Sequence, residues 1–195
     1  MPRFGTAALL FVKKNGKTYV AVSERRTTKP GRWKGTVSFG FSGGLKEGET
    51  PLATLKREMG EELPFIRTSH IKKIIDFIGI PAYISKPGTV LGDEQIPIQH
   101  EGEEIAGHGF LVELKPKAVK KFGIEFENDL QRALQKAKTN KPSSNSNELS
   151  FPTFIPASEA IRLTREHPER VMPHFVSLVT AFEAKFNREW QRKKN

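Results

Sequence analysis

Short apolar runs separated by polar turns characterise the first quarter of the chain. Residues 4–12 and 17–22 are rich in strand formers and flank Asn15-Gly16. Because Asn-Gly accepts positive φ at low cost, this pattern predicts a two-stranded hairpin. Residues 35–41 predict a further short strand, and the Gly- and acid-rich residues 43–49 predict a loop.

Helical spacing begins directly after that loop. Thr50 can cap a helix, Pro51 suits the first helical position, and Pro64 ends the pattern. Apolar residues recur on one predicted face at Leu52, Leu55 and Met59. We therefore expect an amphipathic helix that packs this face against a sheet.

The middle of the chain predicts two further strands, at residues 71–80 and 109–114. The Gly- and Pro-containing residues 86–107 between them predict a loop. A late strand is expected over residues 151–155, interrupted by Pro152.

Residues 115–150 are expected to form an insertion and loop, of which residues 115–141 are basic. A short helix is expected over residues 116–122, ended by Gly123. Residues 128–131 resemble a capping box that opens a second helix, and the polar residues 138–150 predict a loop.

Two helices close the chain. Ser158 is the expected cap of the first, which ends before Pro168, and Pro173 begins the second, over residues 173–192. The last helix carries an apolar stripe at Phe175, Val179, Phe182, Phe186 and Trp190. We expect this stripe to face the core, and a homodimer seam is the alternative.

Composition excludes several classes of chemistry. The chain has no Cys, which excludes a disulfide scaffold, a thiolate zinc site, a thiol nucleophile and an iron–sulfur site. Its 195 residues predict one domain over residues 1–195. No apolar run approaches the ~20 residues of a membrane helix, and residues 1–5 lack signal-peptide features. We expect a cytoplasmic protein without a membrane partner.

Charge divides the chain into three parts with a net charge of +10. Residues 1–42 hold nine basic residues and one acidic, residues 43–112 seven and eleven, and residues 113–195 sixteen and ten. An acidic centre between basic flanks suits anionic ligands and a divalent cation. A solvated basic surface is the ordinary alternative.

The acidic centre contains the chemically informative residues. Glu58, Glu61 and Glu62 lie on adjoining helical positions, so their carboxylates repel one another unless a cation lies between them. Mg²⁺ and Mn²⁺ prefer such oxygen ligands and share them with phosphates. Arg57 is placed to hold one further carboxylate, that of Glu49.

This segment resembles the signature of the Nudix hydrolases, G-x5-E-x7-R-E-U-x-E-E-x-G-U, where U is apolar. Eight of its nine specified positions match: Gly43, Glu49, Arg57, Glu58, Met59, Glu61, Glu62 and Phe65. The resemblance implies an α/β fold, an α/β/α sandwich around a mixed β-sheet. The insertion at residues 115–150 and the C-terminal helices add to it.

The resemblance also implies a reaction and its residues. The family uses Mg²⁺ or Mn²⁺ to cleave a nucleoside diphosphate linked to another moiety, by attack of water on phosphorus. Carried over, Glu58 and Glu62 are metal ligands, and Glu61 is a ligand or accepts the proton of water. Arg57 and Glu49 orient the helix. A further acid from outside the motif is expected among Glu101, Glu103, Glu104 and Glu148, with Glu103 or Glu104 favoured and Glu148 next.

Two departures from the signature stand out. Pro64 replaces the usual Gly, and because Pro cannot adopt positive φ, the chain must leave the helix differently. The Gly43-Gly44 pair lies one residue closer to Glu49 than in many relatives. The carbonyl that the family uses as a metal ligand is therefore that of Ser42, Gly43 or Gly44, and we select Gly43.

The substrate is less constrained. Arg25, Arg26 and Arg32 are candidates for binding phosphates, and Trp33 or Phe39 for stacking on a base. Tyr83 is a further candidate for substrate binding. Pro81 and Tyr83 resemble positions in ADP-ribose pyrophosphatases and diadenosine polyphosphate hydrolases, respectively. An enzyme acting on RNA 5′ ends is the alternative within the same chemistry, and a nucleotide-sensing module without catalysis is the alternative of another class.

Overall fold

The structure is a computed structural model that describes residues 5–26, 35–80, 107–144 and 148–192, and its centre is a mixed β-sheet. The strands are β1 (Gly5–Lys14), β2 (Lys17–Glu24), β3 (Val37–Ser38), β4 (Gly40–Gly44), β5 (Ile71–Ile80), β6 (Gly107–Leu114) and β7 (Thr153–Pro156). Their order is β3-β2-β1-β6-β5, with β4 also on β1 and β7 also on β2. The β1–β6 pair is parallel and the other pairs are antiparallel.

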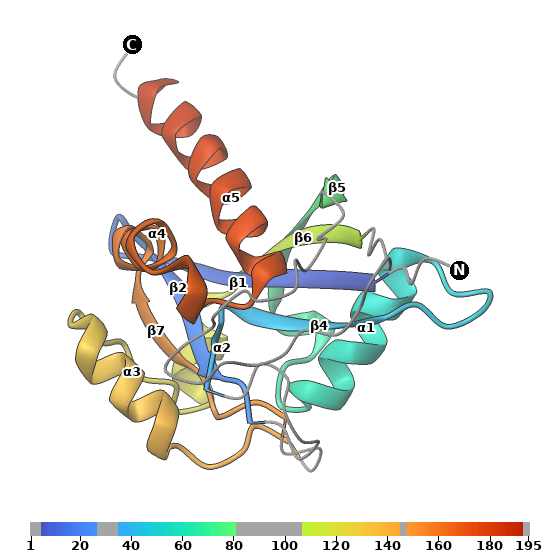
Figure 1. Ribbon diagram of the computed structural model, residues 1–195, viewed down its shortest axis with the longest axis horizontal. Coiled ribbons are helices and arrows are strands. Elements are labelled where there is room, and N and C mark those ends of the chain that lie inside the picture. The colour runs from blue at the N-terminus through green and yellow to red at the C-terminus, as the bar shows by residue number, and fades with distance from the viewer. Residues whose placement is uncertain (1–4, 27–34, 81–106, 145–147, 193–195) are drawn as a thin grey trace.

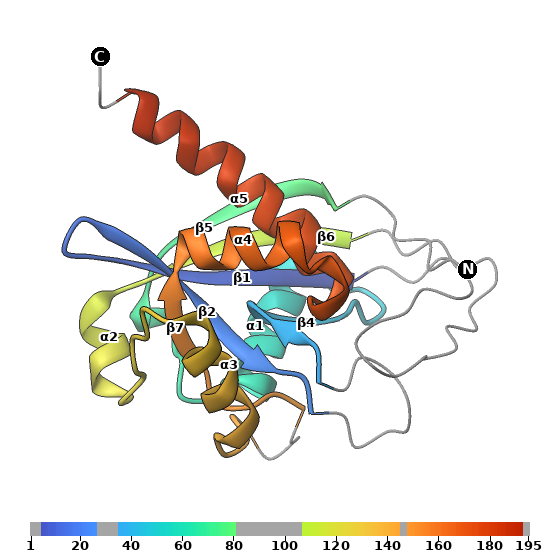
Figure 2. The same ribbon diagram turned by 60° about the vertical axis from the view of Figure 1, so that its left-hand side comes forward.

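Helices cover both faces of this sheet. They are α1 (Pro51–Glu62), α2 (Pro116–Lys121), α3 (Leu130–Thr139), α4 (Ala157–Glu166) and α5 (Pro173–Arg192), with 3₁₀ turns at Thr68–His70 and Pro168–Arg170. Figures 1 and 2 both place α4 and α5 on one side of β1 and α1 on the other. This arrangement confirms the predicted α/β fold with a mixed sheet.

Strand β1 shows why there are two cores. Ala7, Leu9 and Phe11 pack with α3, α4 and α5, whereas the alternate residues of the strand pack with α1 and α2. Since successive side chains of a strand point to opposite faces, an unbroken apolar run is what a strand buried on both faces requires.

Local sequence chemistry positions the ends of the elements as expected. Asn15 and Gly16 take φ values of 50° and 74°, which join β1 to β2 in a tight turn. The Thr50 hydroxyl accepts a hydrogen bond from the Ala53 amide at 3.2 Å and caps α1. Gly123, with φ of 68°, follows α2.

Three expectations for the helices are wrong in detail. Leu52 is 43% exposed and does not lie on the buried face of α1. That face instead includes the carboxylates of Glu58 and Glu62. Asp129 caps α3 by accepting from the Arg132 amide at 2.7 Å, so that helix starts one residue later than the capping-box pattern indicates. Ser158 does not cap α4, because β7 passes directly into the helix at Pro156.

The insertion and the last helix both contribute to the core. Helix α3 buries four apolar residues, and α5 buries Phe175, Val179 and Phe182, so this part of the stripe faces the core as predicted. The side chains of Phe186 and Trp190 lie outside the described part, and the last turns of α5 project away from the sheet (Figure 1). Within the described ranges, no helix combines the length and apolarity that crossing a bilayer requires.

Candidate functional site

The site is built where β4 leads into α1. Leu55 and Met59 anchor the helix in the core, and this packing turns Glu58 toward β4. A Cβ atom added to Gly43 would lie 1.9 Å from the Glu58 carboxyl carbon. Gly43 is therefore required for the close approach of this carboxylate to the strand.

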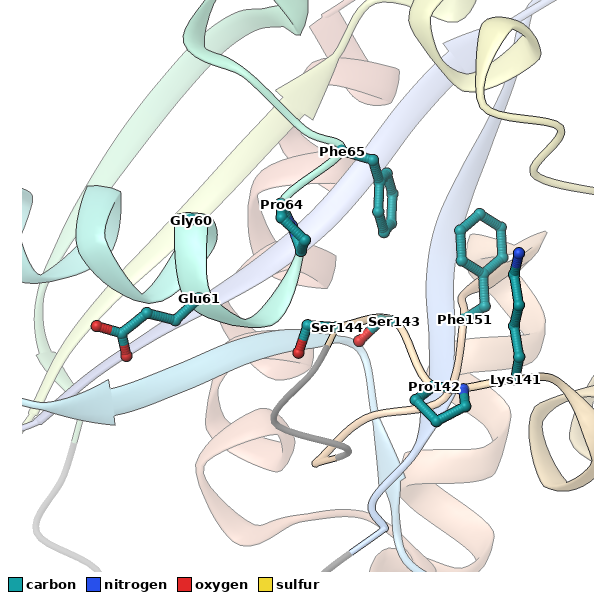
Figure 3. Close-up of a pocket in the computed structure, with 9 residues that line it drawn as sticks. All are labelled: Gly60, Glu61, Pro64, Phe65, Lys141, Pro142, Ser143, Ser144 and Phe151. Atoms are coloured by element: carbon teal, nitrogen blue, oxygen red, sulfur yellow. The ribbon is translucent and has the colours of Figure 1, made fainter.

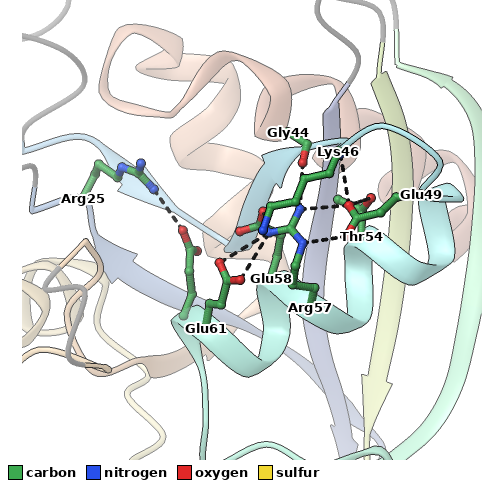
Figure 4. A network of polar contacts seen from close by, with 9 residues as sticks. Arg25, Gly44, Lys46, Glu49, Thr54, Arg57, Glu58 and Glu61 are labelled. Atoms are coloured by element: carbon green, nitrogen blue, oxygen red, sulfur yellow. Dashed lines mark hydrogen bonds and ion pairs between the residues drawn. The ribbon is translucent and has the colours of Figure 1, made fainter.

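Arg57 ties the loop before α1 to the helix (Figure 4). Its Nε and Nη2 donate to the two Glu49 oxygens at 2.8 and 3.0 Å, a bidentate pair, and Nη2 also donates to the Gly44 carbonyl at 2.8 Å. Nη1 donates to Glu58 at 2.5 Å and approaches Glu61 at 3.4 Å. The expected Arg57–Glu49 contact is thus present, within a larger network.

Further donors complete the environment of Glu49. Thr54 donates its hydroxyl to Glu49 Oε2 at 2.8 Å, and the Lys46 amide donates to the same oxygen at 3.1 Å. The hydrogen bond from Arg57, followed by those from Thr54 and Lys46, lowers the pKa of Glu49 to about 2. Glu49 is therefore a permanently charged structural partner at neutral pH.

The second carboxylate group gathers around Glu62, at the C-terminal end of α1. Its side chain is 4% exposed, and Arg25 Nη1 approaches Oε1 at 3.4 Å. Among the described residues, Oε2 has no hydrogen-bond partner. Burial raises the pKa of Glu62 to about 8, against the lowering effect of Arg25 and with a further raising effect of Glu148.

Glu148 reaches this site through long-range pairing. Arg25 Nη2 donates to its carboxylate at 2.8 Å, so one guanidinium contacts both Glu62 and Glu148. The end of β2 holds the segment in place: the Arg26 amide donates to the Glu148 carbonyl at 2.6 Å and the Glu24 amide donates to Ser150 Oγ at 2.8 Å. Glu148 is the one acid proposed outside the motif that falls within the described residues, and it lies beside the motif.

The remaining acids of that prediction, Glu101, Glu103 and Glu104, lie outside the described residues, as do Arg32, Trp33 and Tyr83. Glu61 is described, and its side chain is 53% exposed at the solvent side of the network. Burial raises the pKa of Glu58, with Arg57 opposing that shift.

Within the described ranges, no three acidic or histidine side chains converge tightly enough to cage a metal ion. The donor chemistry nevertheless fits Mg²⁺ or Mn²⁺, which take oxygen ligands from carboxylates. Two observations carry the fit: Glu62 Oε2 has no hydrogen-bond partner among the described residues, and burial, together with the nearby charge of Glu148, raises the pKa of both Glu58 and Glu62. Arg25 and Arg57 neutralise part of the negative charge that a bound divalent ion would neutralise.

Two candidates for substrate binding have other roles in the structure. Phe39 is fully buried, packed edge-on against Phe175 at 6.3 Å between ring centroids, so the prediction that it contacts a base is wrong. The physical reason is that Phe39 joins the core between β3 and β4, where no ring face is open. Arg26 donates to the carbonyls of Lys138 and Asn140, which fixes the end of α3.

Sequence reasoning missed Ser143, which contacts Glu62, and His174, which lies near Arg25. Ser143 donates its hydroxyl to the Glu62 carbonyl at 2.7 Å and so fastens the segment after α3 to the end of α1. His174, at the start of α5, has its pKa lowered to about 3 by burial and by the charge of Arg25. Neither residue belongs to a sequence motif, because each interacts with a residue that is far away along the chain.

Comparisons with known proteins agree with this architecture. The model of the NUDIX domain matches residues 1–175. Solved structures with the same fold include a mutT/nudix family protein from Listeria innocua, at 16% identity and a TM-score of 0.55, covering 98% of each chain. DR0079 from Deinococcus radiodurans matches at 12% identity and a TM-score of 0.54, over 92% of this chain and 82% of that one.

A binary complex of the C. elegans Ap4A hydrolase matches at 12% identity and a TM-score of 0.51, over 95% of this chain and 98% of that one. At such identities the likeness concerns the fold. The comparison with curated proteins found no match.

Proposed function

The chain belongs to the Nudix family, whose hydrolases act on pyrophosphate bonds, and we propose that this member cleaves a nucleoside diphosphate linked to a second moiety, with Mg²⁺ or Mn²⁺ as cofactor. The proposed substrates are a dinucleoside polyphosphate or an ADP-ribose-like nucleotide. The observation that carries the proposal is the buried, incompletely partnered Glu62 beside Glu58 and Glu148.

Each carboxylate has a proposed role set by its surroundings. Glu58, Glu62 and Glu148 would hold the metal ion, together with a carbonyl of the β4 end, for which Gly43 is the candidate next to Glu58. The Gly44 carbonyl already accepts from Arg57. The ion, when bound, would neutralise phosphate charge and lower the pKa of a water molecule.

The chain's own groups would then position and deprotonate. Glu61, exposed at the edge of the cluster, is the group we assign to accept the proton of the attacking water. Arg57 and Glu49 hold the loop and helix in register. Arg25, no longer needed to balance Glu62 and Glu148, would be available to a substrate phosphate.

The test is product analysis with a panel of substrates in Mg²⁺ and in EDTA. The panel holds Ap4A, named for the C. elegans protein of the same fold, with ADP-ribose, NADH, nucleoside triphosphates and a 5′-triphosphate RNA. Glu62→Gln is expected to lose at least ~10²-fold in kcat/KM, because the carboxamide carries no charge for the metal.

Glu47→Gln is the matched control, since Glu47 is an exposed acid of the same loop, and it should retain activity. Cleavage in EDTA, or an equal loss in both variants, would contradict the metal-dependent mechanism. Cleavage of the RNA alone would favour the RNA-end alternative. Nucleotide binding without any cleavage would favour the nucleotide-sensing module over the enzyme.

A further inference from the structure

A pocket of about 670 Å³ opens beside the C-terminal end of α1. Figure 3 shows its two walls: Glu61, Pro64 and Phe65 come from the end of α1, and the opposite wall comes from residues 141–144 and Phe151. Its volume falls within the roughly 300–1,000 Å³ of sites that hold small molecules.

The apolar part of the lining is aromatic and rigid. Phe65 and Phe151 lie with ring centroids 4.9 Å apart, and Phe65 is held from behind by Phe122 at 5.4 Å. Both pocket rings are half-buried, unlike the large phenylalanines of the two cores. Rings fixed in this way offer apolar contact to a planar ligand without further loss of conformational entropy.

The charged residues of the lining lie at opposite ends of the pocket. Glu61, of the proposed catalytic set, lies at one end, and Lys141 lies at the other, with Nζ 6.0 Å from the centre of the Phe151 ring. Lys141 is exposed, and its ammonium is a positive charge beside the aromatic wall. Such a pairing of ring and cation suits a base that carries a phosphate.

The far wall is fixed to the catalytic helix. Ser143 donates to the Glu62 carbonyl at 2.7 Å and to the Leu149 carbonyl at 3.1 Å. Pro64, the one specified position of the family signature that does not match, forms part of the near wall. The pocket therefore lies directly beside the C-terminal end of α1, the helix that carries Glu58 and Glu62.

We propose that this pocket binds a nucleotide end of the substrate, its base against Phe65 and Phe151 and its phosphate near Lys141. The proposal rests on the proposed function, because the nucleotide would be the half of the substrate that extends beyond the carboxylates. It makes Lys141 and Phe151 specificity-determining residues that the motif does not contain.

The experiment measures binding of AMP and of adenosine to the full chain in EDTA, by NMR titration of backbone amides. EDTA removes any contribution of a metal ion at Glu58 and Glu62. AMP is expected to bind about 5- to 10-fold more tightly than adenosine, because one charge contact separates the two ligands.

Two variants separate the contributions. Lys141→Ala should lower AMP affinity to that of adenosine, and Phe151→Leu, which keeps an apolar side chain, should weaken both ligands about 10-fold. Lys138→Ala is the matched control, an exposed lysine near the end of α3 that does not line the pocket, and it should change neither affinity.

Equal AMP affinity in wild type, Lys141→Ala and Phe151→Leu would overturn the proposal. An equal loss in Lys138→Ala and Lys141→Ala would also overturn it, by showing a general charge effect. AMP binding that depends on Lys141, in a protein that cleaves no substrate of the panel, would support the pocket while removing the proposed hydrolysis.

Discussion

Helix α1 has charged side chains gathered at both ends, and the two groups differ in how their charge is met. Near the loop, Glu49 accepts two bonds from Arg57 and further bonds from Thr54 and Lys46. At the other end, Glu62 is more deeply buried, has one distant contact to Arg25, and leaves Oε2 without a partner among the described residues. The first group is complete as a structural element, whereas the second is where the proposed cation would bind.

The largest expected effect comes from neutralising one acid in each group. In EDTA at pH 7, Glu49→Gln should lower Tm, because Arg57 loses its bidentate partner. Glu62→Gln should raise stability by up to about 3 kcal/mol, because a buried carboxyl with a raised pKa no longer has to hold a proton or a charge. Thermal unfolding with and without Mg²⁺ measures both, and the Mg²⁺-dependent rise in Tm should vanish in Glu62→Gln.

The contrast between the two ends also predicts how stability depends on pH. The folded-state pKa of Glu62, about 8, exceeds the ordinary carboxyl value, so the metal-free folded protein binds the extra proton between the two. Its stability should therefore fall as pH rises through 8, and this fall should be absent in Glu62→Gln. Identical pH profiles for the two proteins would contradict the contrast between the two ends.

The next effect concerns the strand that faces the helix. Gly43→Ala would place Cβ 1.9 Å from the Glu58 carboxyl carbon and displace that carboxylate. We expect a loss of about 1–3 kcal/mol in stability and of at least ~10-fold in kcat/KM. Gly44→Ala is the control, because its Cβ would meet nothing within 4 Å. Equal effects of the two substitutions in activity assays would show that the approach of Glu58 to β4 is unimportant.

A smaller effect is expected at His174, near Arg25. Because its folded-state pKa lies near 3 and the unfolded value near 6.5, the unfolded chain binds the additional proton in this range. Stability should decline as pH falls below 6.5, by up to about 1.4 kcal/mol per pH unit. His174→Gln should flatten this slope in urea unfolding, and the exposed His167→Gln should keep it. A slope that survives in His174→Gln would assign the acid sensitivity to other groups.

The smallest effect is expected from restoring the family residue in Pro64→Gly. Leu63 caps the C-terminal end of α1, its amide donating to the Met59 carbonyl at 2.9 Å, and Pro64 follows without a positive φ. Gly should cost about 0.5–1 kcal/mol through the entropy of the unfolded chain, with kcat within about 2-fold of wild type. Urea unfolding and steady-state kinetics measure both. A gain in stability would show that Pro64 is strained.

Features encoded locally were predictable from the sequence, and features assembled over distance were not. The Thr50 cap, the Asn15-Gly16 turn and the Arg57–Glu49 pair depend on residues close in the chain, and each is present. The burial of Phe39 was not predictable, because Ser38 and Gly40 on either side of it are buried as well, and such a run gives no alternation that would separate a core ring from an open one.

The acid from outside the motif was likewise not predictable from local sequence. Glu148 could not be distinguished in sequence from the acids at residues 101–104, because its position depends on the pairing of its segment with the end of β2. The pocket lining at Lys141 and Phe151 depends likewise on Ser143 meeting the end of α1.

The bond between Glu24 and Ser150 joins residues 126 positions apart, and this span has a consequence for the order of events in folding. The hairpin of β1 and β2 and the capped helix α1 can form from nearby residues, but Glu148 reaches Glu62 only after the late segment has docked. Closing so long a loop is slow compared with forming a helix. During refolding, the carboxylates would therefore become a competent ion site last, and recovery of hydrolysis would lag behind recovery of helical structure.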